Sequence, residues 1–142
     1  MASPDNAFQA GIFNRLAGFA TLTSAIGSNK VFDFVPQGTA SPFVRIGEFM
    51  LSDWDTKSKN GWEITFNVHV WSILSLGTKT VNSILSLIHD ALHQQEASIT
   101  VSGFTLVQIR REDHLTIQDP SEEGQNDQYY HGVARYRAIV HA

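Results

Sequence analysis

Two histidines, His89 and His93, have the spacing in this chain that comes closest to a catalytic pattern. They stand in the stretch IHDALH (88–93), where Asp90 directly follows the first of them. Zinc proteases use the pattern H-E-x-x-H on a helix: the two imidazoles bind the metal, and the glutamate is the general base. Here an aspartate, shorter by one methylene, takes the place of the glutamate. One interpretation is therefore a metal-dependent hydrolase that uses His89 and His93.

A helix over residues 78–95 would have to position these histidines. Its apolar stripe consists of Val81, Ile84, Leu85, Ile88 and Leu92. Since each helical residue turns by about 100°, His89 lies roughly 80° and His93 roughly 120° from the centre of that stripe, on the flank of the buried face. A catalytic zinc normally has a third protein ligand, and Glu96 follows too closely to fit the protease spacing. Because polar residues are common at the border of an amphipathic helix, we favour a structural role and expect no metal, no cofactor and no catalytic residue.

The composition of the chain excludes several classes of protein. The chain has 142 residues and a net charge of −4, and residues 112–128 contain acids but no Lys or Arg. We expect that segment to be a solvated acidic loop. It only partly matches a calcium-binding EF-hand loop, because Tyr130 stands where the bidentate glutamate belongs. The chain has no basic cluster typical of nucleic-acid binding, no cysteine, and no apolar stretch long enough to span a membrane.

The remaining elements follow from hydrophobic periodicity. A first helix is expected from residue 4 to about residue 20. Strands are expected at residues 42–51, 62–71, 104–113 and 128–142. The order α-β-β-α-β-β predicts an α+β fold: a mostly antiparallel sheet of about four long strands, with two helices packed on one face. The length fits one domain over residues 1–142.

Strand alternation predicts that one sheet face is left without helices. Residues 62–71 alternate between apolar and polar side chains, so His69 and Trp71 fall on the face opposite the core. Arg135 and Arg137 share that face on the last strand, where they could bind phosphate or pair with Glu63 or Glu48 across the strands, and we favour pairing. Exposed aromatic residues are typical of interfaces. The predicted interface residues are Trp54, Trp71, His69, Arg135 and Arg137.

Four stretches of the sequence, in this order and spacing, resemble a known family. They are VFDFVPQGTASPFVRIGE (31–48), VHVWS (68–72), DALH (90–93) and HGVARYRA (131–138). The resemblance is to the phage tail-completion or tail-terminator family, once catalogued as a domain of unknown function, which includes the tail terminators of gene transfer agents. It covers roughly residues 8–140.

The resemblance implies a structural role in a virion tail. Such proteins form a hexameric ring that caps the head-proximal end of the tail tube, stops its polymerisation and joins the tail to the head connector. The implied partners are further copies of the chain, the major tail tube protein and the head-tail connector or stopper protein. The protein would be assembled in the cytoplasm of a host bacterium, without a membrane. The alternative within this class is a head-side neck or connector ring protein.

The family has no catalytic residues to carry over to this chain. DNA would pass through the ring without specific binding. Like charge would then keep DNA from adhering to the wall of the lumen, and the acidic loop is a candidate for that wall. The residues predicted to line the lumen are Asp119, Glu122, Glu123 and Asp127.

Overall fold

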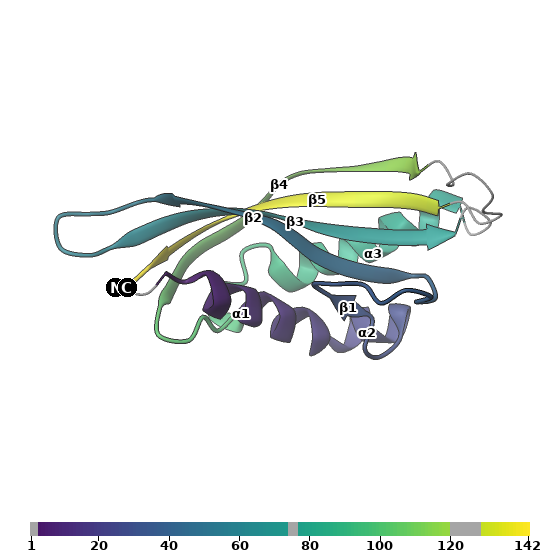
Figure 1. The fold of residues 1–142 in the computed structure, drawn as a ribbon, viewed down its shortest axis with the longest axis horizontal. Helices are drawn as coiled ribbons and strands as arrows, with labels where there is room; N and C mark the ends of the chain where they lie inside the picture. Colours follow the sequence, from purple (N-terminus) through teal and green to yellow (C-terminus); the bar gives the residue numbers. More distant parts are fainter. Residues whose placement is uncertain (1–2, 74–76, 120–128) are drawn as a thin grey trace.

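The computed structural model describes residues 3–73, 77–119 and 129–142. In that part of the chain, a twisted sheet of five strands carries all the helices on one face (Figure 1). The strands are β1 Val31–Phe32, β2 Phe43–Asp53, β3 Gly61–Ile73, β4 Thr105–Asp119 and β5 Tyr129–His141. The helices are α1 Asp5–Ala17, α2 Ala20–Ile26 and α3 Gly77–Leu92, followed by the short 3₁₀ helix η2 Glu96–Ser98. The strand order is β1-β2-β3-β5-β4.

The α+β class and the two long helices on one sheet face are confirmed, but the prediction of four antiparallel strands and two helices is wrong in detail. The described sheet is mixed, because the short β1 pairs in parallel with β2. A third helix, α2, follows α1 almost directly. Its side chains Leu22 and Ile26 are buried in the common core, and that burial stabilises a helix too short to be stable alone.

The segment from Glu112 to Asp119 is strand and not loop, which corrects the prediction made from its charge. Leu115 and Ile117 lie opposite Val133 and His131 of β5. Continuous pairing with β5 thus extends β4 well beyond the predicted end at residue 113. The acids Glu112 and Asp113 are compatible with a strand because they lie at the edge of the sheet, where their side chains are exposed to water.

Period-two alternation in β3 is confirmed. Ile64, Phe66, Val68 and Val70 are fully buried beneath the helices. Phe66 lies at the centre of an aromatic group, with ring centroids 5.3 Å from Phe8, 5.5 Å from Phe49 and 5.5 Å from Tyr136. The apolar stripe of α3 is buried as predicted. None of the helices among the described residues has the length and apolar character needed to cross a membrane.

Candidate interaction surface

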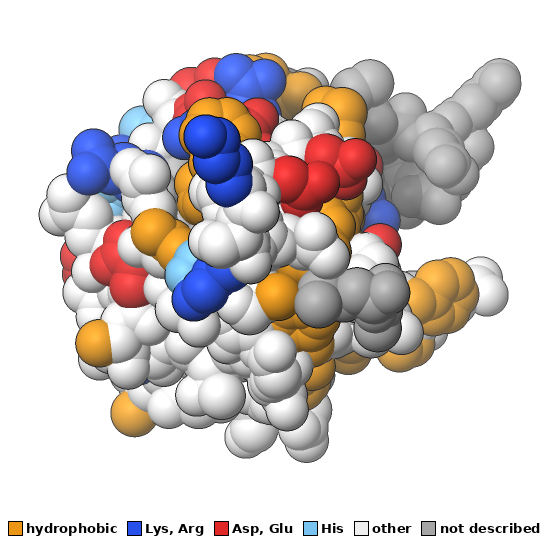
Figure 2. Space-filling view, turned by 90° about the vertical axis from the view of Figure 1, so that its left-hand side faces the viewer, with side chains coloured by type: hydrophobic (Ala, Val, Ile, Leu, Met, Phe, Trp, Pro, Cys, Tyr) orange, Lys and Arg blue, Asp and Glu red, His pale blue; other side chains and the backbone are white. Residues whose placement is uncertain are grey.

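The sheet face opposite the helices carries the predicted interface residues. We call it the open face. His69, Trp71, Arg135 and Arg137 reach it from the two central strands, β3 and β5. Trp54 follows β2 directly, and its backbone N–H donates to the carbonyl of Gly61. Figure 2 looks at the end of the molecule that bears the β2–β3 hairpin, where positive and negative side chains are interspersed and do not gather by sign.

Four rings from three strands stack at one end of the open face; we call them the aromatic ladder. Its members are Phe43, His69, Trp71 and His131. The register explains the contact, because Trp71 lies directly between Phe43 of β2 and His131 of β5. The rings of Trp71 and His131 are nearly parallel, with centroids 4.3 Å apart. Stacking at this separation favours one rotamer for each of these rings, which lowers the entropy that binding a partner would cost.

A line of hydrogen bonds joins the ladder to an acid. His131 Nε2 lies 2.8 Å from His69 Nδ1, and His69 Nε2 lies 2.6 Å from Glu48 Oε2. One set of tautomers satisfies both bonds: His131 donates to His69, and His69 donates to the carboxylate. Glu48 lies in a bulge of β2, between Gly47 and Met50, with a positive φ of 47°. The bulge places the carboxylate of Glu48 beside His69, a juxtaposition that alternation alone does not predict.

The carboxylate of Glu48 is held in its charged form. Burial acts to raise the pKa of Glu48, but hydrogen bonds from His69 and Asn67 outweigh it, together with the positive charge of Arg45 and that of His69 when its ring is protonated. The pKa of Glu48 therefore lies below its ordinary value. Arg45 donates to the second carboxylate oxygen at 2.7 Å, which completes the shell around the acid.

Replacing Glu48 with glutamine is expected to reduce the loss of unfolding free energy that occurs when the pH is lowered. Since the pKa of Glu48 is lowered by folding, its carboxylate stabilises the fold above its unfolded pKa, and this contribution is lost as pH falls through the folded pKa. The side chain is half exposed, so we expect less than about 1 kcal/mol. Urea unfolding at pH 7 and pH 3 measures the effect: the wild type should lose more stability than Glu48→Gln. Equal losses in both proteins would contradict it.

Two arginines of the open face, Arg135 and Arg137, are paired with carboxylates. Arg137 donates to Glu63 at 2.6 Å, which confirms the predicted cross-strand pair. Its guanidinium carbon also lies 5.6 Å from the centre of the Trp54 ring, within the range of a cation–π contact. Arg135 pairs with Asp113 of β4 at 2.7 Å, and not with Glu48. With their charge neutralised by carboxylates, these side chains are poorly suited to act as a phosphate clamp.

His89 lies on the flank of α3, as the helical projection predicts, and His93 directly follows the last residue of α3, Leu92, short of the predicted helix end at residue 95. Both side chains are half-buried. Their rings stack with centroids 4.4 Å apart. His93 Nδ1 accepts a hydrogen bond from the backbone N–H of Arg111 at 3.1 Å, so His93 caps a backbone group of the edge strand β4. Within residues 3–73, 77–119 and 129–142 there is no group of three or more His, Cys, Asp or Glu side chains arranged to hold a metal ion. The contacts of His93 give the DALH stretch a structural role.

Stability is expected to rise as pH increases toward 6.5, the ordinary pKa of histidine, because folding lowers the pKa of His89. Burial lowers the pKa of His89, and the positive charges of Arg111, His93 and His114 lower it further, while Asp90 raises it. The unfolded chain therefore binds more protons than the folded chain between the two pKa values, and stability increases as pH rises through that window. Urea unfolding at pH 5.5 and pH 7.5 should show a smaller gain for His89→Gln than for the wild type.

An opposite change serves as the control for His89. Asp90→Asn removes the charge that raises the pKa of His89, so this variant should gain more stability than the wild type over the same pH interval. If the wild type, His89→Gln and Asp90→Asn all gain the same stability between pH 5.5 and pH 7.5, His89 is not the cause of the pH dependence.

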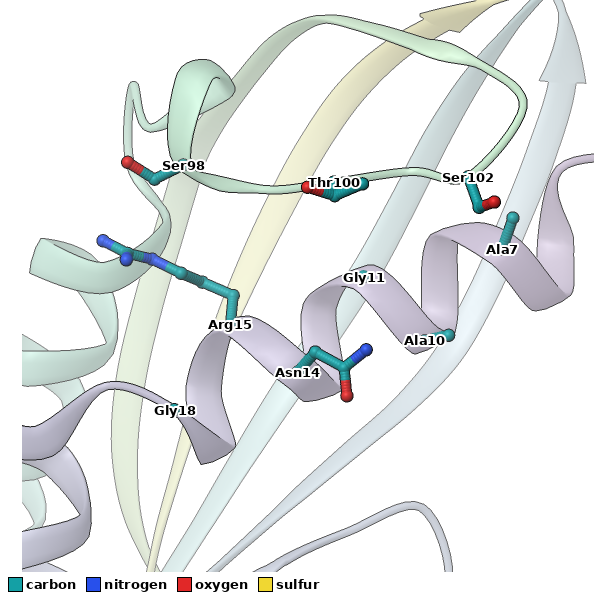
Figure 3. A pocket seen from close by; sticks show the side chains of 9 residues that line it. All are labelled: Ala7, Ala10, Gly11, Asn14, Arg15, Gly18, Ser98, Thr100 and Ser102. Atoms are coloured by element: carbon teal, nitrogen blue, oxygen red, sulfur yellow. The ribbon is translucent and has the colours of Figure 1, made fainter.

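A hollow of about 400 Å³ lies between α1 and the chain at residues 98–102 (Figure 3). Its wall is made of small residues and backbone, and the side chains of Asn14 and Arg15 point in different directions. The Nε of Arg15 donates to the carbonyl of Ala91 at 2.7 Å. Such a wall offers few convergent polar groups, so this hollow is a by-product of helix packing and not a binding site.

Comparisons with known proteins identify the family to which this chain belongs. The chain matches the family model of the tail completion protein gp17 over residues 10–141. It is similar to a chain in a solved structure described as the virion of a native gene transfer agent particle, with a TM-score of 0.83, 22% identity and coverage of 100% of both chains. A second solved structure shares the fold at a TM-score of 0.54 and 12% identity, covering 94% of both chains. No curated protein matches the sequence.

The class is thus a structural protein of a phage-type virion tail. Within that class, the chain belongs to the tail completion protein gp17 family, whose model spans nearly its whole length. The expectation drawn from the four sequence stretches is confirmed at the level of the family. The interface role of Trp54, Trp71, His69, Arg135 and Arg137 stays a prediction.

Proposed function

We propose that this protein is a tail terminator: a ring of six copies at the head-proximal end of a phage-like tail tube. The ring ends the polymerisation of the tube protein and offers a docking surface to the head-tail connector. The observation that carries the proposal is the family match over residues 10–141. It is supported by the similarity of the whole chain to a component of a gene transfer agent virion.

The open face is the proposed contact surface within the tail. Trp and Arg are the residues that most often dominate binding energy at protein interfaces. Trp71 is ordered by the aromatic ladder, and Trp54 is held near the paired Arg137. Because these side chains are ordered in the free protein, docking would lose little of their rotamer entropy. This is a surface for binding protein, and the proposed function includes no chemical step.

The proposed lumen wall is acidic. Asp119 is the last residue of β4. Glu122, Glu123 and Asp127 lie outside the described residues. Acidic side chains facing the lumen would repel the phosphate backbone, so DNA would pass without binding. Replacing all four with Asn or Gln would then slow DNA ejection from intact particles and leave tail length unchanged.

The test is tail morphology in particles made without this chain. Electron microscopy should show tails of variable length that are not joined to heads, and supplying the wild-type chain should restore uniform, attached tails. Tails of normal length without heads would indicate a neck protein in place of a terminator. Uniform tails joined to heads would overturn the proposal. In solution, the ring would have a mass of about 95 kDa, six times the 15.8 kDa of one chain.

A further inference from the structure

The outer edge of β4 is capped by hydrogen bonds over only part of its length. Ile109 and Arg111 direct their backbone groups away from β5, toward the end of α3. There Gln94 N–H donates to the carbonyl of Ile109, and the Ile109 N–H donates to Glu96. His93 accepts from the Arg111 N–H. This half of the edge is closed to further strands.

The other half of the β4 edge has no such cap. Ile109 lies opposite Ala138 of β5, and His114 and Thr116 lie opposite Ala134 and Gly132, in the same alternating series. Their backbone N–H groups therefore also point away from β5. Among the described residues, no hydrogen bond reaches these two N–H groups. Unpaired edge groups of this kind are a template for another strand.

The uncapped half also exposes apolar side chains. Leu115 is 51% exposed and Ile117 is 47% exposed. Both lie on the open face, since they pair with Val133 and His131. Exposed apolar side chains beside unpaired backbone N–H groups are typical of a surface that a protein partner covers.

The opposite edge of the sheet is formed by β1, which lies far from β4 in the strand order (Figure 1). Phe32 lies opposite Arg45 of β2, and thus on the open face. Phe34 follows two residues later and is 79% exposed. The two ends of the sheet therefore carry different exposed apolar groups, as a head-to-tail contact between identical copies requires.

Strand direction fits a contact between these two edges. β1 is parallel to β2, and each later neighbour in the order β2-β3-β5-β4 is antiparallel. β4 therefore runs opposite to β1 within one copy. Rotation about an axis along the strands preserves their directions, so the β1 of the next copy would meet β4 as an antiparallel neighbour. Repeating the rotation closes a ring.

We propose that copies of this chain join edge to edge: residues 114–117 of β4 pair with β1, Val31–Phe32, of the next copy, and Phe34 covers Leu115 and Ile117. This inference rests on the proposed ring and names its subunit contact. The open face is left for the tube protein or the connector.

Proline at position 116 tests the strand pairing. Proline removes the outward N–H and is tolerated in edge strands at such positions. Thr116→Val is the matched control, since it keeps the N–H and loses only the side-chain hydrogen bond to Asn82. We expect Thr116→Pro and Phe34→Ser each to weaken assembly of the chain at least tenfold, as measured by native mass spectrometry, while Thr116→Val assembles like the wild type. A mixture of Thr116→Pro and Phe34→Ser should form one-to-one dimers and no ring, because only one intact contact remains.

Cross-linking gives a second readout, because the natural chain contains no cysteine. In a variant with both Phe34→Cys and Leu115→Cys, the two thiols lie on opposite edges of one copy, so oxidation can join only different copies. We expect a series of covalent oligomers from dimer to hexamer, whereas either single variant should give no covalent oligomer. Absence of these covalent oligomers would overturn the proposal. Covalent dimers of the single variant Leu115→Cys would also overturn it, because they would indicate a symmetric contact between two β4 edges. The two proposals can fail separately. If the covalent oligomers form as expected but particles made without the chain have normal tails, the terminator role is refuted and the edge pairing still holds.

Discussion

Phe66→Ala is expected to lower the free energy of unfolding by about 3–5 kcal/mol, the usual cost of truncating a buried phenylalanine. The side chain is fully buried and contacts three other rings, from α1, β2 and β5. Those rings come from elements on both sides of β3, so no single shift can fill the space that is left. Urea unfolding monitored by circular dichroism measures the change, and the transition midpoint should fall without a change in slope.

Phe34→Ala is the matched control for Phe66→Ala. It removes the same atoms from a side chain that is 79% exposed in one copy, so at a concentration at which the chain is monomeric the free energy of unfolding should change by less than about 0.5 kcal/mol. A large loss at Phe34 would mean that this side chain is buried in the free protein, and comparable losses at both positions would contradict the assigned core. The control also shows whether variants at Phe34 fold, which the edge-pairing experiments need.

Alternation and helical periodicity are sufficient to predict the faces of the elements. The pattern in residues 62–71 identifies the buried side chains of β3, because a strand has only two faces and one of them is covered. The stripe of α3 was predictable for a similar reason. The face of a strand residue is a local property, whereas burial is not always local. His69 lies on the uncovered face and is still only 7% exposed, because side chains from β2 and β5 contact it.

Pairing partners are not local, and there the sequence was insufficient. The acids between Glu112 and Asp119 indicated a loop, yet pairing with β5 makes that segment a strand. Tertiary hydrogen bonds outweigh the weak preference of single residues here. The two-residue β1 has too few side chains for any periodicity.

The site residues divide in the same way. His69 and Trp71 were placed on the correct face, but their contacts with His131 depend on which strand lies beside β3. The partnership of His69 with Glu48 also needs a bulge in β2, which no spacing rule locates. His93 was recognised as a flank residue, whereas its bond to the Arg111 N–H follows from the position of β4 at the sheet edge.

Gly11→Ala is a case in which two effects of opposite sign compete. On helix propensity alone, alanine in place of glycine within α1 should stabilise the protein by about 1 kcal/mol. The contact predicts the reverse, since a Cβ at this position would lie 2.4 Å from the carbonyl oxygen of Thr100. That oxygen is backbone, flanked by the buried side chains of Ile99 and Val101. It can retreat only if those residues move as well.

Overpacking of this kind typically costs about 1–3 kcal/mol, which is more than the gain in propensity. We therefore expect Gly11→Ala to lower the free energy of unfolding by up to about 2 kcal/mol, the overpacking cost less the gain in propensity. Asn14→Ala provides the comparison on the same helix: its side chain is exposed, and the change should stay within about 0.5 kcal/mol. Urea unfolding of both variants decides the sign. A stabilised Gly11→Ala would mean that α1 has room to move away from residues 98–102, and that Gly11 is not what brings the helix and this segment into close contact.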